Sequence, residues 1–313
     1  MNILDIALSS IPFLSLREKI LLRKNIDSLD KLSILSKVEL SSIIQRDVRK
    51  AFWDGNHFRA LTEKASLIMG AKDIKSVVFG SAEYPYLLSQ IPDAPYVLYY
   101  RGNLEVLERQ CISVVGTRNL DEEGAESALE FSRSAASFGN TIVSGLAFGT
   151  DSFAHRGAVE AKGATCAVLP CGIDTVVPLS NRGLAQRILS NNGVVCGEYL
   201  PGTPCEGWRF VQRNRIIAAL SCATVVIQAG KGSGSLLTAD FALDYDRDLF
   251  FHRSCLEYEK KCRVQPKNIN KRSPSSYIEE GAQIIDSYAD FVDLENNPYG
   301  LSRNSSGQLN LSF

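Results

Sequence analysis

The sequence predicts an α/β fold in which a doubly wound, mostly parallel sheet follows a small all-helical N-terminal domain. Six short apolar runs are bounded by glycine, helix-length amphipathic segments separate these runs, and the first 77 residues show only helical spacing. Continuous apolar runs are typical of parallel strands that helices cover on both faces. Such units in series form a doubly wound domain.

The N-terminal segment, residues 1–77, is rich in leucine, isoleucine, lysine and serine and poor in proline. Leu16, Ile20 and Leu21 are spaced to lie on one face of a helix. Residues 38–53 repeat this spacing as far as Phe52. We therefore expect a helical domain over 1–77, with its lysines and arginines on a solvated face.

The segment 78–294 is expected to form the sheet domain. After an irregular stretch rich in proline and tyrosine, each apolar run is a predicted strand. The runs are 111–116, 141–145, 165–170, 193–199, 223–229 and 248–251. A basic stretch, 253–276, lies within this domain, and residues 295–313, rich in Asn, Ser and Gly, are expected to be a flexible tail.

Composition excludes several classes of function. The net charge is −1, no apolar run reaches the roughly 18–20 residues of a membrane span, and the N-terminus lacks a secretory signal. We expect a cytoplasmic protein with no membrane partner. The eight cysteines form no C-x-x-C pair and the three histidines are scattered, so we expect reduced cysteines, no metal and no cofactor.

Glycine, serine, threonine and arginine dominate the loops that follow the predicted strands. In a doubly wound sheet these loops meet at the carboxyl edge, where ligands bind. Backbone N–H groups, hydroxyls and cations suit anionic oxygens. The sequence therefore predicts an anion-binding edge, built from loops 116–124, 144–155, 169–181, 197–215 and 229–239.

The first of these loops offers Gly116, Thr117 and Arg118 for one phosphate. It is not a G-x-G-x-x-G dinucleotide fingerprint, because Arg118 occupies the place of the second glycine. A glycine turn after a strand is as consistent with a structural turn as with an anion site, and both interpretations stay open.

The loop 229–239 is not a P-loop, because Lys231 precedes the glycines instead of starting the helix. Ser233 or Ser235 could cap the helix that follows or bond an anionic oxygen. Asp151 and His155, four positions apart, could share a helix face. We expect this pair to fasten a loop and not to form a hydrolase triad with Ser144, since no G-x-S-x-G elbow is present.

Three arginines lie within seven positions at the start of a predicted helix that begins near Val211. Arg209, Phe210, Arg213 and Asn214 are expected at its rim, where cations could track phosphates while the ring stacks a base. The alternative is that Phe210 is a core residue and that the arginines pair with acids such as Glu198 and Glu206. Neither interpretation is favoured by these residues alone.

Taken together, six motifs resemble the DprA/Smf family of bacterial DNA-processing proteins. They are "SVVGTR", "IVSGLAFGTDSFAHRGAV", "AVLPCGID", "GEYLPGTP", "FVQRNRIIAALS" and "GSGSLLTADFAL". The match spans about 81–251 and resumes at 277–291, which looks like the closing helix of the family. The chain departs from the family at Gln228, where glutamate is usual, and at 253–276, which replaces an expected Val-Pro-Gly loop.

The resemblance implies an extended Rossmann-like domain that binds single-stranded DNA, forms homodimers and loads the RecA recombinase in natural transformation or recombination, without catalytic turnover. By position, Arg118 and the turn of Ser144 and Gly145 would contact phosphates. Phe210, Arg213, Asn214 and Arg215 would form the adjoining wall, with Ser233, Gly234 and Ser235 as the floor. The full set of expected DNA-binding residues is Gly116, Thr117, Arg118, Ser144, Gly145, Arg209, Phe210, Arg213, Asn214, Arg215, Lys231, Ser233, Gly234 and Ser235.

Two other classes of function are alternatives to this one. The first is a small-molecule enzyme, a nucleotide or phosphoribosyl hydrolase of Rossmann-like type, whose signature glutamate has no counterpart in loop 229–239. The second makes the N-terminal helices a partner-docking module and the DNA site secondary.

Overall fold

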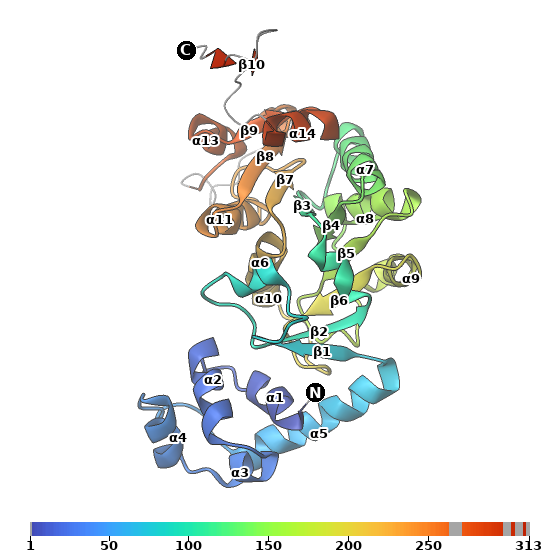
Figure 1. Ribbon diagram of the computed structural model, residues 1–313. Coiled ribbons are helices and arrows are strands. Elements are labelled where there is room, and N and C mark those ends of the chain that lie inside the picture. The colour runs from blue at the N-terminus through green and yellow to red at the C-terminus, as the bar shows by residue number, and fades with distance from the viewer. Residues whose placement is uncertain (1, 263–270, 297–301, 304–308, 311–313) are drawn as a thin grey trace.

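Nine strands form one sheet in the part of the chain that the computed structural model describes, residues 2–262, 271–296, 302–303 and 309–310 (Figure 1). The strand order is β1-β2-β6-β5-β4-β3-β7-β8-β9. The six predicted strands are β3 to β8 and run parallel, as does β9, whereas β2 is antiparallel to β1 and β6. The predicted α/β fold with a doubly wound, mostly parallel sheet is confirmed.

The strand bounds are β1 Lys75–Val78, β2 Val97–Gly102, β3 Cys111–Val115, β4 Thr141–Ser144, β5 Thr165–Val168, β6 Val194–Gly197, β7 Ala223–Val226, β8 Asp248–His252 and β9 Gln283–Ile285. Two further short strands, β10 Ser302–Arg303 and β11 Leu309–Asn310, pair with each other. They fall in the predicted tail 295–313, most of which lies outside the described residues.

Helices cover both faces of the sheet. In β3, Ile112 and Val114 pack among residues of α7, α8 and α14, while Cys111 and Val115 pack among residues of α10, α11 and α13. This alternation follows from the two-residue period of a strand. The helices of the sheet domain are α6 Tyr86–Ser89, η1 Leu104–Glu108, α7 Glu122–Ser137, α8 Thr150–Glu160, η2 Leu179–Asn181, α9 Arg182–Ser190, α10 Gly207–Ala219, α11 Leu236–Asp244, α12 Ser254–Lys261, α13 Pro274–Glu279 and α14 Tyr288–Asn296.

The N-terminal region is helical and lies beside β1 and β2, at the opposite end of the sheet from β9 (Figure 1). Its helices are α1 Ile3–Ser9, α2 Leu16–Asn25, α3 Leu29–Ile34, α4 Lys37–Ile44 and α5 Gly55–Lys72. The Asp5 carboxylate accepts a 2.7 Å hydrogen bond from the hydroxyl of Tyr96, and Ser9 and Tyr99 share another of the same length. These buried polar contacts fix α1 against the start of β2.

The strand order places a topological switch point beside β3. The chain builds β4, β5 and β6 on one side of β3 and then returns to the other side with β7. The backbone N–H of Thr117, just past β3, donates to the carbonyl of Gln228, just past β7, at 2.7 Å. Ligands of doubly wound sheets bind at such a point, outside the carboxyl ends of the strands.

Three local predictions are wrong. The helical spacing over 38–53 ends early, because α4 stops at Ile44 and leaves Phe52 65% exposed. The predicted closing helix over 277–291 is instead α13, β9 and α14, interrupted at Gly281, whose φ is +109°. The predicted start of the arginine-bearing helix near Val211 is also too late, since α10 begins at Gly207.

All eight cysteines are free. The Sγ atoms of Cys166 and Cys196 lie 3.5 Å apart on the neighbouring strands β5 and β6. Within the described residues, no three histidine, cysteine or acidic side chains are grouped so that they could hold a metal ion. No helix in the same part of the chain has the length and apolarity to cross a membrane.

Candidate nucleic-acid interface

The loop that follows β3 is held tightly at its base and is exposed at its tip. A Cβ at Gly116 would lie 2.4 Å from the hydroxyl of Thr150, so only glycine fits there. Gly149, at φ +72°, brings its backbone against the carbonyls of Thr117 and Arg118. These two close approaches lock the loop onto α8 and leave the Arg118 side chain exposed.

Arg118 lies over the ring of Phe210. The guanidinium carbon is 5.1 Å from the ring centre, a cation–π distance, and the phenylalanine is half-buried in the first turn of α10. The structure therefore combines features of the two alternatives considered for Phe210. One part of the ring packs inward, and another supports an exposed cation from a different loop.

Arg213 is a core residue, and the prediction that it lies at the rim is wrong. Its side chain is 3% exposed and donates to the carbonyls of Gly145 (2.7 Å) and Val168. Burial lowers its pKa, and the nearby carboxylate of Asp151 opposes that shift. A Cβ at Gly145 would overlap the guanidinium, which explains the glycine. Arg213 thus joins the ends of β4 and β5.

Asp151 fastens the loop after β4 without help from His155. Its carboxylate accepts hydrogen bonds from the backbone N–H groups of Gly145 and Ala147, both at 3.2 Å. Burial raises the pKa of Asp151, and Arg213 opposes that shift. His155 contacts Thr165 instead, at 2.7 Å, and burial lowers the pKa of the imidazole to about 3. The expected loop fastening is confirmed for Asp151, and the expected pairing of Asp151 with His155 is wrong.

Ser144 and Gly145 lie below the surface. The Ser144 hydroxyl donates to the carbonyl of Val114 at 2.7 Å and is fully buried. The Gly145 carbonyl and N–H are both engaged, by Arg213 and Asp151. In this structure these two residues hold the strand ends together and present no free donor to a phosphate.

The other two arginines of α10 are paired with acids. Arg215 is buried and contacts the carboxylates of Glu198 and Asp93, the latter at 3.2 Å. Arg209 pairs with Glu206 at 3.2 Å and donates to the carbonyl of Pro204. The alternative in which acids neutralise these cations is therefore confirmed for both side chains. Sequence spacing alone could not distinguish these two paired arginines from the exposed Arg118.

The loop 229–235 forms a floor beside α10. The hydroxyls of Ser233 and Ser235 bond each other at 2.9 Å, and neither side chain caps α11. Asn214, half-buried on α10, donates to the carbonyl of Gly234 at 3.3 Å. Lys231 and Ser233 are half-buried, Gly234 is exposed and Ser235 is buried. The floor therefore offers one cation, one hydroxyl and exposed backbone.

Sequence reasoning missed Tyr258 as a neighbour of this site. It comes from α12, in the basic stretch 253–276, and its hydroxyl donates to the carbonyl of Asn119 at 2.9 Å. Its only signal in the sequence was an aromatic residue among lysines. The cations around it are paired, Lys260 with Glu257 and Lys261 with Asp121. Residues 263–270 of this stretch lie outside the described residues.

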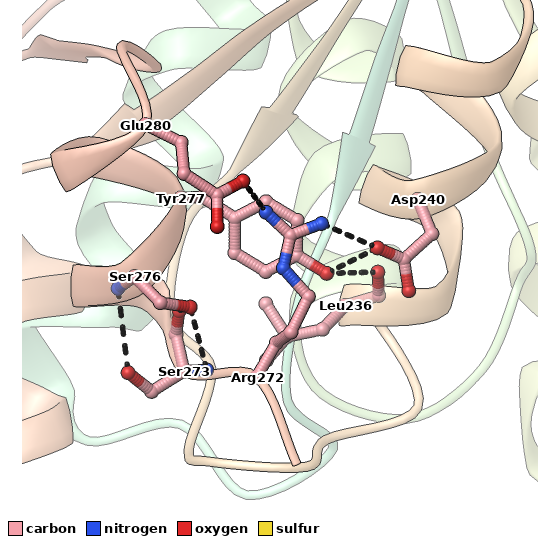
Figure 2. A network of polar contacts seen from close by, with 7 residues as sticks. All are labelled: Leu236, Asp240, Arg272, Ser273, Ser276, Tyr277 and Glu280. Carbon is pink, nitrogen blue, oxygen red and sulfur yellow. Dashed lines mark hydrogen bonds and ion pairs between the residues drawn. The ribbon is translucent and has the colours of Figure 1, made fainter.

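Figure 2 shows how Arg272, near the end of the basic stretch, and Tyr277 of α13 are bonded to α11. The Arg272 guanidinium lies 3.6 Å from the ring centre of Tyr277 and contacts the carboxylates of Asp240 and Glu280. The Tyr277 hydroxyl donates to Asp240 at 2.6 Å. The carbonyl of Arg272 accepts from the N–H of Gly232 at 3.0 Å, so the segment that leads into α13 is bonded directly to the floor loop.

The residues that remain accessible define what we call the strand-end surface. It comprises Thr117, Arg118, Phe210, Asn214, Lys231, Ser233 and Gly234. Two cations, an amide, hydroxyls and a half-buried ring converge there. Cations, an amide, hydroxyls and a partly accessible ring are groups that suit anionic oxygens and flat rings, and none of these seven residues is a histidine or a carboxylate. The fold and this surface define a doubly wound α/β protein with a cationic, partly aromatic surface at the topological switch point of its sheet.

The chain belongs to the family of DNA recombination-mediator protein A, whose family model matches residues 75–296. Protein Smf of Borreliella burgdorferi is 31% identical over 245 residues, 78% of this chain and 77% of that protein. DNA processing protein DprA of Streptococcus pneumoniae is 40% identical over 167 residues, 53% of this chain but only 58% of that protein. The resemblance to the DprA/Smf family is thus confirmed.

Two solved structures are similar to this one. The X-ray structure of DprA from Streptococcus pneumoniae has a TM-score of 0.71 at 27% identity and covers 94% of this chain and 98% of that one. A structure of DNA processing protein A from Helicobacter pylori, concerned with its single-stranded DNA binding mode, has a TM-score of 0.59 at 26% identity. It covers 72% of this chain and 97% of that one.

Proposed function

We propose that this DNA-processing protein binds single-stranded DNA at the strand-end surface and releases it unaltered. The observation that carries the proposal is the exposed Arg118 guanidinium over the half-buried Phe210 ring, at the switch point of the sheet. A cation that neutralises a phosphate beside a ring that stacks a base is the combination that single strands require.

The buried residues of the expected site act indirectly in this proposal. Arg213, Asp151 and Ser144 hold the ends of β3, β4 and β5 at fixed separations. Direct contacts then come from the accessible side chains of the strand-end surface. Thr117 and Gly116 shape the first loop, while Arg209 and Arg215 are neutralised by acids and position α10.

Membership of the family and the single-stranded DNA binding of the Helicobacter pylori protein support this proposal. By the same likeness we propose that the protein acts in the cytoplasm as a homodimer and loads the RecA recombinase during recombination or natural transformation. It would do so as a mediator, without turning over a substrate.

The test is a gel shift with single- and double-stranded oligonucleotides of the same sequence at two salt concentrations. We expect preferential binding of the single strand and an affinity that falls steeply with salt, because phosphate neutralisation releases counterions. Equal affinity for both forms, or no binding to either, contradicts the proposal. Unchanged oligonucleotide after long incubation is expected on a denaturing gel.

A further inference from the structure

A cleft of about 690 Å³ lies between the N-terminal helices and the side of α10 that faces away from the strand-end surface. Leu14 and Lys19 line it from the helical region, and Tyr199, Trp208 and Arg215 line it from the sheet domain. None of the strand-end residues borders it. Its volume falls in the range of small-ligand sites, which is about 300–1,000 Å³.

The mouth of this cleft is aromatic and backed by a cation. Trp208 is 55% exposed and meets the ring of Tyr199 edge-on, with 6.4 Å between centres. The Arg209 guanidinium lies 5.0 Å from the Trp208 ring and 5.1 Å from the Tyr199 ring. A large exposed ring held by neighbours on one side is suited to stack another flat ring on its free side.

The floor of the cleft holds one unpaired donor and one unpaired acceptor. Glu198 and Arg215 are ion-paired through Oε2 and Nη2, and both line the cleft. Within the described residues, the other oxygen of Glu198 and Nη1 of Arg215 are buried and have no hydrogen-bond partner. Unmade hydrogen bonds of charged buried groups are costly, so a ligand that carries both a donor and an acceptor would be favoured there.

We propose that this cleft accepts a nucleobase of the same single strand that contacts the strand-end surface. This inference rests on the proposed function. Every DNA base is flat and carries an N–H donor near a ring or carbonyl acceptor, which matches a stacking wall above an unpaired donor and acceptor. A proline-rich peptide, which also suits aromatic grooves, would bring no N–H group for Glu198 on its proline rings.

The path from the strand-end surface to the cleft crosses the start of α10. Trp208 and Phe210 are two positions apart in its first turn, so their side chains leave the helix on opposite sides. Gly207, the first residue of the helix, has nothing within 4 Å of where its Cβ would be. A strand that stacks one base on Phe210 can pass over this open position and place a later base on Trp208.

Tryptophan fluorescence provides the test, because the chain has only two tryptophans, Trp53 and Trp208. The variant Trp53→Phe leaves Trp208 as the sole reporter. Oligothymidine long enough to reach both places should quench its fluorescence with the same midpoint as the anisotropy change of a labelled strand. Binding by anisotropy without any fluorescence change overturns the cleft proposal and leaves the proposed function intact, whereas absence of both signals overturns both.

Two further measurements identify what occupies the cleft and test whether Trp208 itself contributes to binding. Equal quenching by thymidine monophosphate and by the oligonucleotide would show a free-nucleotide site and overturn the strand path. Trp208→Ala should weaken binding of the long oligothymidine about 5-fold or more. Val211→Ala, also exposed and on the same helix but outside the cleft, should not. Equal affinities of the two variants contradict the proposal.

The variant Glu198→Gln tests the floor. A glutamine can keep the hydrogen bond to Arg215 through its carbonyl oxygen while its amide replaces the unpaired acceptor with a donor. We expect weaker quenching of Trp208 by oligothymidine. Unchanged quenching would show that Glu198 does not contact the base and would overturn this assignment of the floor.

Discussion

Arg118 and Phe210, from the loop after β3 and the first turn of α10, meet with 5.1 Å between the guanidinium carbon and the ring centre. A guanidinium that lies over a ring uses its flat face for that contact. Its N–H groups point outward along the plane and stay available as donors. One pair of residues can therefore present phosphate-binding donors and a stacking surface next to each other.

Replacement of Arg118 by alanine should weaken single-stranded DNA binding about 5- to 10-fold at low salt and reduce the slope of log affinity against log salt by about 0.7, because one phosphate contact is lost. Fluorescence anisotropy over a salt series measures both quantities. Arg109→Ala is the matched control, since this exposed arginine precedes the other end of β3. An equal loss in the two variants would show that only net charge matters.

Replacement of Phe210 by alanine should cost about 1–3 kcal/mol of binding free energy and leave the salt slope unchanged, because stacking and not charge is removed. The control is Phe138→Ala, an exposed phenylalanine at the end of α7. Isothermal titration at two salt concentrations separates the contribution of stacking from that of charge. A changed salt slope for Phe210→Ala would mean that the ring acts mainly by positioning Arg118.

Replacement of Arg213 by alanine should destabilise the fold by about 3–5 kcal/mol, because it leaves the buried carboxylate of Asp151 without its cation. Urea denaturation gives the free energy of unfolding. Adding Asp151→Asn to this variant should recover part of the loss, since no buried charge then remains unpaired. A fully stable Arg213→Ala variant with a reduced salt slope would instead support direct phosphate contact.

The buried imidazole of His155 should make the protein less stable in acid. Its pKa is about 3 in the folded chain against 6.5 for an exposed histidine, so between these values only the unfolded chain binds the proton. Stability should fall as pH drops through this window, by up to about 1.4 kcal/mol per pH unit. The variant His155→Gln should lose this slope.

Urea midpoints from pH 7 to pH 4 for the wild type and His155→Gln measure the difference. Asp151, whose pKa is raised, contributes a stability that increases as the pH falls, which is the opposite of the His155 effect. Because Asp151 is present in both proteins, its contribution cancels when the two are compared. Parallel curves for the two proteins would mean that His155 is protonated in the folded state, contrary to its burial.

The variant Gln228→Glu should be destabilised by about 1–3 kcal/mol near neutral pH. The amide of Gln228 donates to the Asp121 carboxylate at 2.6 Å, and glutamate would oppose two carboxylates there. The nearby Asp121 carboxylate would raise the pKa of the new carboxyl, so stability should recover as the pH falls and that carboxyl takes up a proton. Adding Asp121→Asn should restore it at neutral pH, because asparagine still caps α7. If Gln228→Glu is as stable as the wild type, the carboxylates at positions 121 and 228 can move apart.

The strands of the core could be predicted because a strand that is buried on both faces appears in the sequence as a continuous apolar run. Residues 141–144 and 223–226 contain no charge and form central parallel strands. The strands β1 and β2 escaped prediction because β2, antiparallel to both neighbours, lies in a stretch dominated by proline and tyrosine. The strand β9, three residues long, is too short to show a period.

The site could be predicted only in part, because arginines look alike in a sequence. Arg118 and Arg213 both lie within motifs shared with the family. The Arg118 side chain is nevertheless exposed, whereas Arg213 is buried, with 3% of its surface exposed. What separates them is the partner that the fold brings in from elsewhere, Asp151 for Arg213 and Glu198 for Arg215. Long-range partners of this kind leave no local pattern.

The bond from the Tyr258 hydroxyl to the carbonyl of Asn119 bears on how the protein is made. A ribosome releases the loop after β3 long before it releases α12, and the strand β7 that pairs with β3 also comes late. Polypeptides halted between these points lack the contacts that β7 and α12 make with β3 and the loop after it. The loop that carries Arg118 would therefore reach its final position only after α12 has been synthesised.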